Sequence, residues 1–109
     1  MIIDFSKLEA NKVEKMRGGE GYVVLKKFSD GLNSIVRITI PQNCSIGIHT
    51  HTEDQEIIYV IKGKGLCIED GNTYELEAGQ CNYCAQNKNH SIRNPYSEDL
   101  ELFAVITRQ

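Results

Sequence analysis

The sequence predicts an all-β protein that folds as a barrel or a double-sheet sandwich. From Tyr22 onward, short runs of β-forming residues are separated by turn signals at regular spacing, which is typical of these folds. No stretch after residue 21 has both the length and the periodicity of a helix. At 109 residues we expect one domain with one hydrophobic core.

Each expected strand is an apolar or alternating run that ends at residues favouring turns. The first run stops at Ser29-Asp30-Gly31, the second at Pro41, and Asp70-Gly71 is the signature of a tight hairpin. In chain order the expected strands are residues 22–28, 35–40, 46–51, 56–61, 66–69, 73–76, 81–84, 90–93 and 100–106.

The first 21 residues have a mixed pattern and end in Arg17-Gly18-Gly19-Glu20-Gly21, where the glycines indicate a loop. We expect residues 1–21 to form a segment that packs on the barrel or swaps between two copies. Residues 22–109 are then the barrel domain.

The strand at residues 56–61 is apolar on both faces after its first residue, whereas a sheet with one solvated side alternates. Its outer face therefore needs a cover. The other sheet, the N-terminal segment and a second copy of the protein all remain possible covers.

Charge and composition exclude several kinds of partner. The formal net charge is -3, and acidic and basic residues are mixed along the chain, so neither a nucleic acid nor an anionic membrane is expected to bind. The N-terminus lacks a basic region followed by a long apolar run, and no later stretch is long enough to cross a bilayer. We therefore expect a soluble, cytoplasmic protein.

The four cysteines are Cys44, Cys67, Cys81 and Cys84. If residues 81–84 form a strand, the last two thiols lie on opposite faces, about 10 Å apart between their Cα atoms, which is too far for a disulfide. A redox or zinc pair in a turn is one alternative. We favour four reduced thiols that behave as small hydrophobic side chains, because one Cys-x-x-Cys pair is not the usual pattern of a structural zinc site.

Two of the three histidines stand one residue apart in His49-Thr50-His51. Residues two apart in a strand project to the same side, so both imidazoles point to one place, and Gly47 on that face leaves room beside them. A polar turn follows, and Glu56 begins the return strand. Two imidazoles and one carboxylate on a hairpin are typical of a transition-metal site, and the fold can bring the third histidine, His90, alongside.

The spacing of these residues resembles the two motifs of the cupin family. The first motif here reads Asn43, five residues, His49-x-His51, four residues, Glu56, six residues, Gly63. The second lies over Gly79, Ala85, Asn87, His90 and Asn94 with every spacing kept. The chain departs from the family at Asn43, Ala85 and Asn87, which replace a glycine, a proline and a turn glycine. None of the three is a ligand position, and asparagine tolerates the backbone conformation of a turn glycine.

The resemblance implies a jelly-roll β-barrel, the cupin-type double-stranded β-helix. It also implies one divalent transition metal, Fe, Mn, Ni, Zn, Co or Cu, held by the counterparts of His49, His51, Glu56 and His90. Homodimers are common in the family. Four protein ligands on a six-coordinate ion leave two positions for a small-molecule substrate, O₂ or water.

Function is open between three classes at this stage, the third of which is a structural barrel that binds no metal. The first is a metal-dependent enzyme of oxygenase, decarboxylase, isomerase or lyase type, which includes dioxygenase-like chemistry. The alternative is a non-catalytic cupin that binds or senses a sugar or carboxylate. Residue parity places Ile58 and Val60 on the pocket side of the strand and Tyr59 on the other side. Arg37 either points into the barrel toward a substrate carboxylate or lies on the exposed face, and Tyr83 and Arg93 have no predicted orientation.

Overall fold

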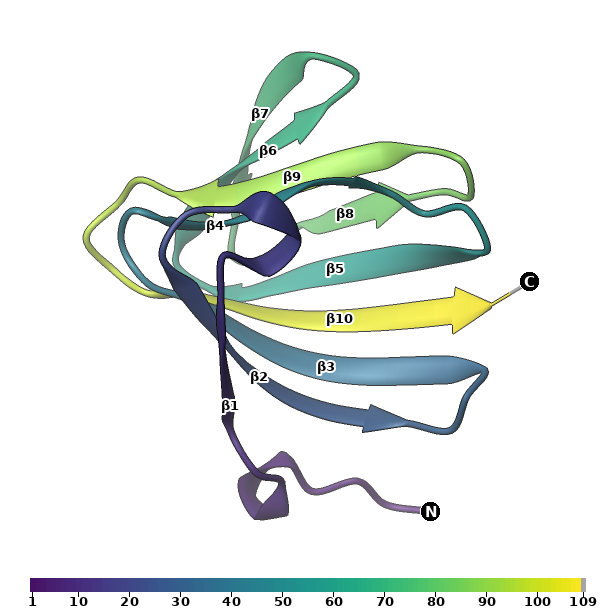
Figure 1. The fold of residues 1–109 in the computed structure, drawn as a ribbon. Helices are drawn as coiled ribbons and strands as arrows, with labels where there is room; N and C mark the ends of the chain where they lie inside the picture. The colour runs from purple at the N-terminus through teal and green to yellow at the C-terminus, as the bar shows by residue number, and fades with distance from the viewer. Residues whose placement is uncertain (109) are drawn as a thin grey trace.

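The computed structural model describes residues 1–108, which form two antiparallel sheets that enclose one core (Figure 1). Two short 3₁₀ turns, η1 (Phe5–Lys7) and η2 (Met16–Gly18), lie in the N-terminal segment. The strands are β1 (Asn11–Glu14), β2 (Tyr22–Ser29), β3 (Asn33–Ile40), β4 (Cys44–Thr50), β5 (Asp54–Lys62), β6 (Lys64–Glu69), β7 (Asn72–Glu77), β8 (Cys81–Cys84), β9 (Asn89–Asn94) and β10 (Leu100–Arg108).

One sheet has six strands in the order β1-β2-β3-β10-β5-β8, and the other has four in the order β4-β9-β6-β7. Consecutive strands therefore often lie in different sheets, as in a jelly roll. Strand β10 sits in the middle of the larger sheet, where Leu102 is opposite Ile38 on one side and Val60 on the other. The predicted all-β jelly-roll class is confirmed.

The core lies between the inner faces of the two sheets. Alternate residues of each strand are buried, as the period of two requires. In β3 these are Val36, Ile38 and Ile40, and in β10 Leu102 and Ala104 are completely buried. Few polar or charged side chains are buried with them. Most of these belong to the site described below.

All nine predicted strands are present, with ends that differ by a few residues. The structure adds β1, which pairs with β2 from Asn11 opposite Leu25 to Glu14 opposite Tyr22. The sequence of this strand has no apolar alternation, so it carried no strand signal. In the structure, Val13 is its one half-buried residue. The Phe5 ring of η1 packs edge-on against Phe103 on the outer face of the larger sheet, with centroids 6.1 Å apart.

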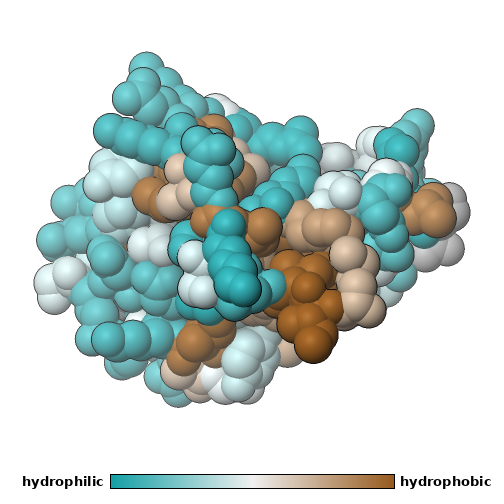
Figure 2. All heavy atoms as spheres, turned by 90° about the horizontal axis from the view of Figure 1, so that it is seen from below, coloured by the Kyte–Doolittle hydropathy of each residue, from teal (hydrophilic) through white to brown (hydrophobic). Residues whose placement is uncertain are grey.

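The outer face of β5 stays uncovered along part of its length. Ile57, Tyr59 and Ile61 are 42%, 42% and 40% exposed in the single chain. The N-terminal segment covers Phe103 but leaves these three side chains open to solvent. On the side where the N-terminal segment lies, Figure 2 shows hydrophobic side chains gathered in one area among hydrophilic ones.

Within residues 1–108, none of the helical turns has the length and apolar character that a membrane crossing requires.

Candidate metal centre

Four side chains from three strands and one loop converge inside the barrel. His49 lies near the end of β4, His51 follows that strand, Glu56 lies on β5 and His90 on β9. Antiparallel pairing of β4 with β9 places His49 directly opposite His90. The four predicted ligands are therefore brought together, with their ligand atoms all within 4.8 Å of one another.

The converging atoms are the Nε2 nitrogens and one Glu56 oxygen. His90 Nε2 lies 3.1 Å from both His49 Nε2 and His51 Nε2, and 2.9 Å from Glu56 Oε1. Glu56 Oε1 is 3.1 Å from His51 Nε2 and 3.9 Å from His49 Nε2. His51, Glu56 and His90 are each less than a tenth exposed.

The Nδ1 atom of each ring points away from the centre toward an oxygen. His49 Nδ1 is 2.8 Å from the Gly47 carbonyl, His51 Nδ1 is 2.6 Å from Asp54 Oδ1, and His90 Nδ1 is 2.7 Å from Asn82 Oδ1. These oxygens accept hydrogen bonds, so each Nδ1 carries its proton and donates it. In the neutral rings, the three Nε2 atoms are left with lone pairs that face one another.

This arrangement fits a metal ion. Three lone pairs and a carboxylate oxygen packed together without a donor among them are an unfavourable buried cluster, and a cation satisfies all four at once. Hydrogen bonds from Nδ1 to an oxygen are also the usual support of a histidine that ligates through Nε2. The chemistry of the donor set suits a divalent transition metal.

The spacing of the candidate ligand atoms is close to the spacing that one shared ion would require. Atoms that each lie about 2.1 Å from one ion are about 3.0 Å apart at octahedral angles and about 3.4 Å apart at tetrahedral angles. Four of the measured separations are 2.9 to 3.1 Å. A six-coordinate ion held by these four residues would keep two positions for other molecules.

Electrostatics within the metal-free cluster pull Glu56 and His51 in opposite directions. Burial raises the pKa of Glu56, but the three imidazoles gathered around its carboxylate, any of which donates to it from Nε2 once protonated there, outweigh burial and hold that pKa well below its usual range. The hydrogen bond to Glu56 raises the pKa of His51 against the opposing effect of burial, and the Asp54 carboxylate adds to this. Without a metal, the cluster therefore attracts a proton.

A small cavity of about 50 Å³ adjoins the four ligands. Its walls are mostly aliphatic, from Ile38, Ile46, Ile58, Ile92 and Ile106. Met16 and Arg17 of η2 and Ser91 of β9 complete the lining. A cavity of this size is far smaller than the roughly 300 Å³ or more of pockets for drug-sized ligands, so it suits a molecule of few atoms.

Turn η2 is held over β4 by close backbone contact. A Cβ atom on Gly47 would lie 2.2 Å from the Arg17 carbonyl oxygen, and one on Gly19 would lie 2.2 Å from the Ser45 carbonyl oxygen. The room beside Gly47 that the sequence indicated is therefore filled by η2. Arg17 itself has a left-handed backbone, with φ of 55°.

The other pocket residues suggested by the sequence have different positions. Ile58 lines the cavity as predicted, whereas Val60 is buried in the core beyond it. Arg37 lies on the outer face of the larger sheet, where its guanidinium is 3.8 Å from Glu101, so it does not reach the metal centre. Tyr59 and Tyr83 are both exposed on that outer face, as predicted for Tyr59.

The sequence did not identify the residues that support or border the ligands. Asp54 and Asn82 hold the rings of His51 and His90, and Arg17 borders the cavity. Of these three residues, only Asp54 had a local sequence signal. It is a carboxylate three residues after His51, and it begins β5. Asn82 and Arg17 reach the site through pairing and packing that a single sequence does not reveal.

Both asparagines that replace motif glycines have left-handed backbones, with φ of 63° at Asn43 and 69° at Asn87. The substitutions therefore preserve the turns. Asn94, the last residue of the second motif, is buried and has a structural role: its Nδ2 donates to the carbonyl oxygens of Ile40 and Glu98.

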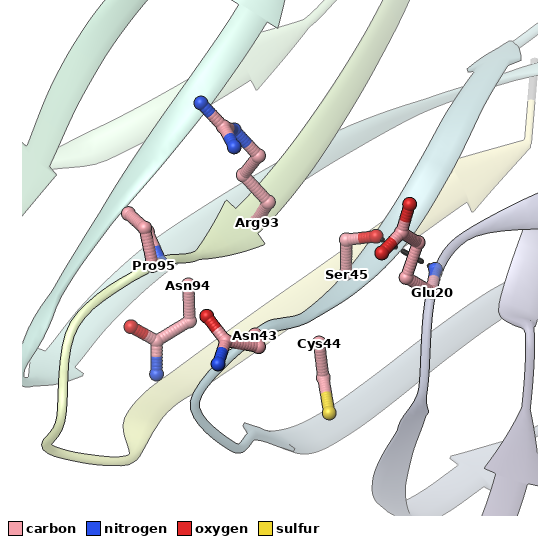
Figure 3. Close-up of a pocket in the computed structure, with 7 residues that line it drawn as sticks. All are labelled: Glu20, Asn43, Cys44, Ser45, Arg93, Asn94 and Pro95. Carbon is pink, nitrogen blue, oxygen red and sulfur yellow. Dashed lines mark hydrogen bonds between the residues drawn. The ribbon is translucent and has the colours of Figure 1, made fainter.

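A second, polar hollow lies where β4 begins and β9 ends (Figure 3). Its volume is about 290 Å³, and Arg93 and Glu20 are exposed at its rim. Two of its polar groups already have structural partners, because Ser45 Oγ accepts from the Glu20 amide and Asn94 binds main-chain carbonyls. It contains no group of metal-ligating side chains comparable to the histidine cluster, as judged over residues 1–108.

The four cysteines have free thiols. Cys44, Cys67 and Cys84 are buried and Cys81 is exposed, so the residues of the Cys81–Cys84 pair do face opposite sides of their strand. Burial, with help from the Glu69 carboxylate, raises the pKa of Cys67 to about 12, and burial raises that of Cys84 to about 11.

Comparison with known proteins agrees with this fold. The family model described as "Cupin domain" matches residues 36–106, and the chain belongs to this family. An oxalate-binding protein of Thermotoga maritima is 29% identical, over 97% of this chain and 93% of that protein.

Solved structures are similar over the whole fold. The crystal structure of a predicted oxalate decarboxylase from Thermotoga maritima superposes with a TM-score of 0.93 at 28% identity, and the match covers all of both chains. An RmlC-like cupin from Shewanella frigidimarina gives a TM-score of 0.81 at 16% identity, covering 99% of this chain and 90% of that one. The second similarity concerns the fold alone.

Proposed function

We propose that this protein binds one divalent transition metal through His49, His51, Glu56 and His90, and uses it to bind a small carboxylate of the oxalate class. The observation that carries the proposal is the convergence of four ligand atoms at a cavity of about 50 Å³. The name of the similar oxalate-binding protein supports this choice of ligand.

The metal would supply Lewis acidity and two coordination positions, which suit a ligand that chelates with two oxygens. Fe, Mn, Ni, Zn, Co and Cu all accept this donor set, and their availability in the cell decides among them as much as affinity does. The aliphatic walls exclude water and strengthen the electrostatic attraction for an anion inside the cavity.

Arg17 would provide the charge that selects an anionic ligand. Among the described residues that line the cavity, it is the one whose side chain is permanently cationic, and Arg17 is exposed at the border of the cavity. A guanidinium binds a carboxylate with two parallel hydrogen bonds, so it recognises the ligand oxygens that the metal does not hold. Arg17 has a left-handed backbone, a conformation in which glycine is less strained than arginine. An arginine at such a position is consistent with a role for its side chain.

Catalysis at the same centre is the second candidate, favoured by the two positions left open on a six-coordinate ion. Oxygenation, decarboxylation, isomerisation and lyase chemistry all use such positions. However, apart from the four ligands, Arg17 is the only ionisable side chain in the described lining, and arginine remains protonated. The site therefore supports binding more directly than a reaction that needs a protein acid or base.

The test begins with elemental analysis of protein purified without a metal-affinity tag or chelator. We expect about one equivalent of metal, lost in the His49→Ala/His90→Ala variant. Calorimetry on the metal-loaded protein should then show oxalate binding that disappears on metal removal. Arg17→Gln should weaken oxalate binding roughly 10-fold or more and leave the metal in place, whereas Lys15→Gln in the same turn should change neither.

Two results would overturn the proposal: no metal uptake after reconstitution, or oxalate binding that survives its removal. Loss of oxalate with release of a one-carbon product by the metal-loaded protein would favour the catalytic candidate instead. The same samples serve both measurements.

We also propose that the protein forms a homodimer through the outer face of β5. Ile57, Tyr59 and Ile61 make an exposed apolar row on a strand that is apolar on both faces. A second copy presents the same row, so a twofold contact is self-complementary. This is the cover that the sequence pattern requires and that the N-terminal segment leaves incomplete.

A further inference from the structure

We propose that Asn82 and Glu69 act as a pair of positioning residues that fix the tautomer of His90 and thereby make its Nε2 available to the metal. The chain of contacts runs from His90 on β9 to Asn82 on β8 and then to Glu69 on β6. The inference deepens the proposed metal binding and rests on it, although its central prediction concerns the metal-free protein.

The contacts define one direction of donation. His90 Nδ1 lies 2.7 Å from Asn82 Oδ1, and Asn82 Nδ2 donates to Glu69 Oε1. His90 is 1% exposed and Asn82 is 5% exposed, so water does not compete for these groups. A carboxylate accepts and does not donate, so Glu69 draws the amide NH₂ toward itself. The amide oxygen must then face His90, whose Nδ1 has to carry the proton.

The other two histidines need no such second residue. His49 Nδ1 faces a main-chain carbonyl, and His51 Nδ1 faces the Asp54 carboxylate. Both partners only accept, so the Nδ1–H tautomer is fixed directly. An asparagine amide can present either its oxygen or its NH₂, and within residues 1–108 Glu69 is the contact that decides which. His90 is therefore the ligand whose tautomer depends on a residue two contacts away.

The pair also connects the two sheets. Asn82 belongs to the larger sheet, whereas Glu69 and His90 belong to the smaller one. Glu69 Oε1 additionally accepts from the Cys67 thiol at 3.8 Å. Glu69 is half-buried and borders a surface hollow together with Lys88.

Removing the acceptor should release the amide. In Glu69→Leu, Asn82 can turn its NH₂ toward His90, which then favours the tautomer with the proton on Nε2, where it blocks metal binding. In the double variant Asn82→Asp/Glu69→Leu, an acceptor-only group faces His90 whatever its orientation, and the original tautomer should return.

The experiment combines two readouts on these variants. NMR of ¹⁵N-histidine-labelled, metal-free protein reports which ring nitrogen of His90 carries the proton. Competition with a chelator for Mn²⁺ or Zn²⁺ reports metal affinity. Glu75→Leu, which removes an exposed carboxylate from the same β6–β7 hairpin, is the matched control.

We expect His90 to be protonated on Nδ1 in the wild type, Glu75→Leu and the double variant. Glu69→Leu should show the Nε2–H form at His90 alone and bind metal about 10- to 100-fold more weakly. The proposal is overturned if Glu69→Leu keeps both tautomer and affinity, or if Glu75→Leu loses as much as Glu69→Leu. It is also overturned if the double variant is not rescued.

The two proposals fail separately. If no protein in the series binds metal, the proposed function fails, while the tautomers of His90 in Glu69→Leu and the double variant still decide this inference. If Glu69→Leu does not fold, the Asn82→Gln variant replaces it, because its longer amide breaks the alignment with Glu69. A wild-type tautomer of His90 in Asn82→Gln then overturns the inference.

Discussion

The Nε2 atoms of His51 and His90 lie 3.1 Å apart, while the Nδ1 atom of each ring faces an oxygen. In the neutral state, two acceptors therefore face each other across a space from which water is largely excluded. A proton or a metal ion resolves this contact, and both the stability and the ligand chemistry of the protein depend on which of them is present.

Metal binding should raise thermal stability considerably. A ligand at 100 times its dissociation constant stabilises the folded state by about 2.7 kcal/mol, which corresponds to roughly 10 °C in Tm for a domain of this size. Differential scanning fluorimetry with Mn²⁺, Co²⁺, Ni²⁺ and Zn²⁺, each compared with EDTA-treated protein, measures this shift. His90→Ala should abolish it. A shift of equal size in that variant would mean that the ions bind elsewhere.

The metal-free protein should be most stable at mildly acidic pH. The pKa of His51 is raised, so its contribution is complete below its ordinary value of 6.5 and is lost as pH rises through the raised value. The pKa of Glu56 is lowered, so its contribution is present above its ordinary value of 4.5 and is lost at much lower pH. Both contributions are therefore complete between about pH 4.5 and 6.5.

Urea denaturation with EDTA at pH 5.5 and pH 8 tests this, and we expect the higher midpoint at pH 5.5. The stabilisation that metal adds to the metal-free protein should be larger at pH 8 than at pH 5.5, because protons compete with the metal for the same nitrogens. A metal-free protein that is more stable at pH 8 would contradict the assigned hydrogen bonds.

The convergence of the four candidate ligands could be predicted from the sequence because their placement depends on local rules. His49 and His51 share a face by the period of a strand, Glu56 returns on the next strand, and His90 matched a second motif. Most strand positions followed in the same way. Strand β1 did not, because Asn11–Glu14 has no apolar alternation and is a strand only through its pairing with β2.

The surroundings of the ligands depend on contacts between distant segments. Arg37 and Arg17 illustrate the difference. Alternation within β3 was compatible with an outward Arg37, but the sequence alone left its direction open, and the structure places it beside Glu101. Arg17 lies at the cavity because the backbone of η2 packs against Gly47, thirty residues away, and no periodic pattern signals such a contact.

Thiol reactivity should separate Cys81 from the other three cysteines. Burial raises the pKa of Cys67 to about 12 and that of Cys84 to about 11, so both stay protonated and inaccessible near neutral pH. Titration with DTNB should find no more than one fast thiol in the native protein and four after denaturation. Cys81→Ser should remove the fast thiol. Rapid reaction of two or more native thiols would contradict the predicted burial.

The dimer should depend on Tyr59. Tyr59→Glu puts a charge in the middle of the exposed row on β5, and burying an unpaired charge in an interface is costly, so we expect a monomer. Tyr74→Glu makes the same change at a residue that is 52% exposed on β7 of the other sheet and should leave the dimer intact. Sedimentation velocity distinguishes the two. A wild type that is monomeric at micromolar concentration would refute the proposed interface.

Gly47→Ala should weaken ligand binding by displacing η2 while leaving the metal bound. The added Cβ would lie 2.2 Å from the Arg17 carbonyl oxygen and 2.8 Å from the Gly19 amide nitrogen, and both are backbone atoms that cannot rotate away. We expect a loss of about 1 to 3 kcal/mol in the free energy of unfolding, together with weaker oxalate binding as Arg17 moves.

Gly31→Ala is the control, since Gly31 has φ of 92° but open space around it and lies in the β2–β3 turn. That variant should lose some stability and keep its oxalate affinity. If Gly47→Ala retained full affinity for oxalate, η2 would have no part in the ligand site, and Arg17 would have to be excluded from it.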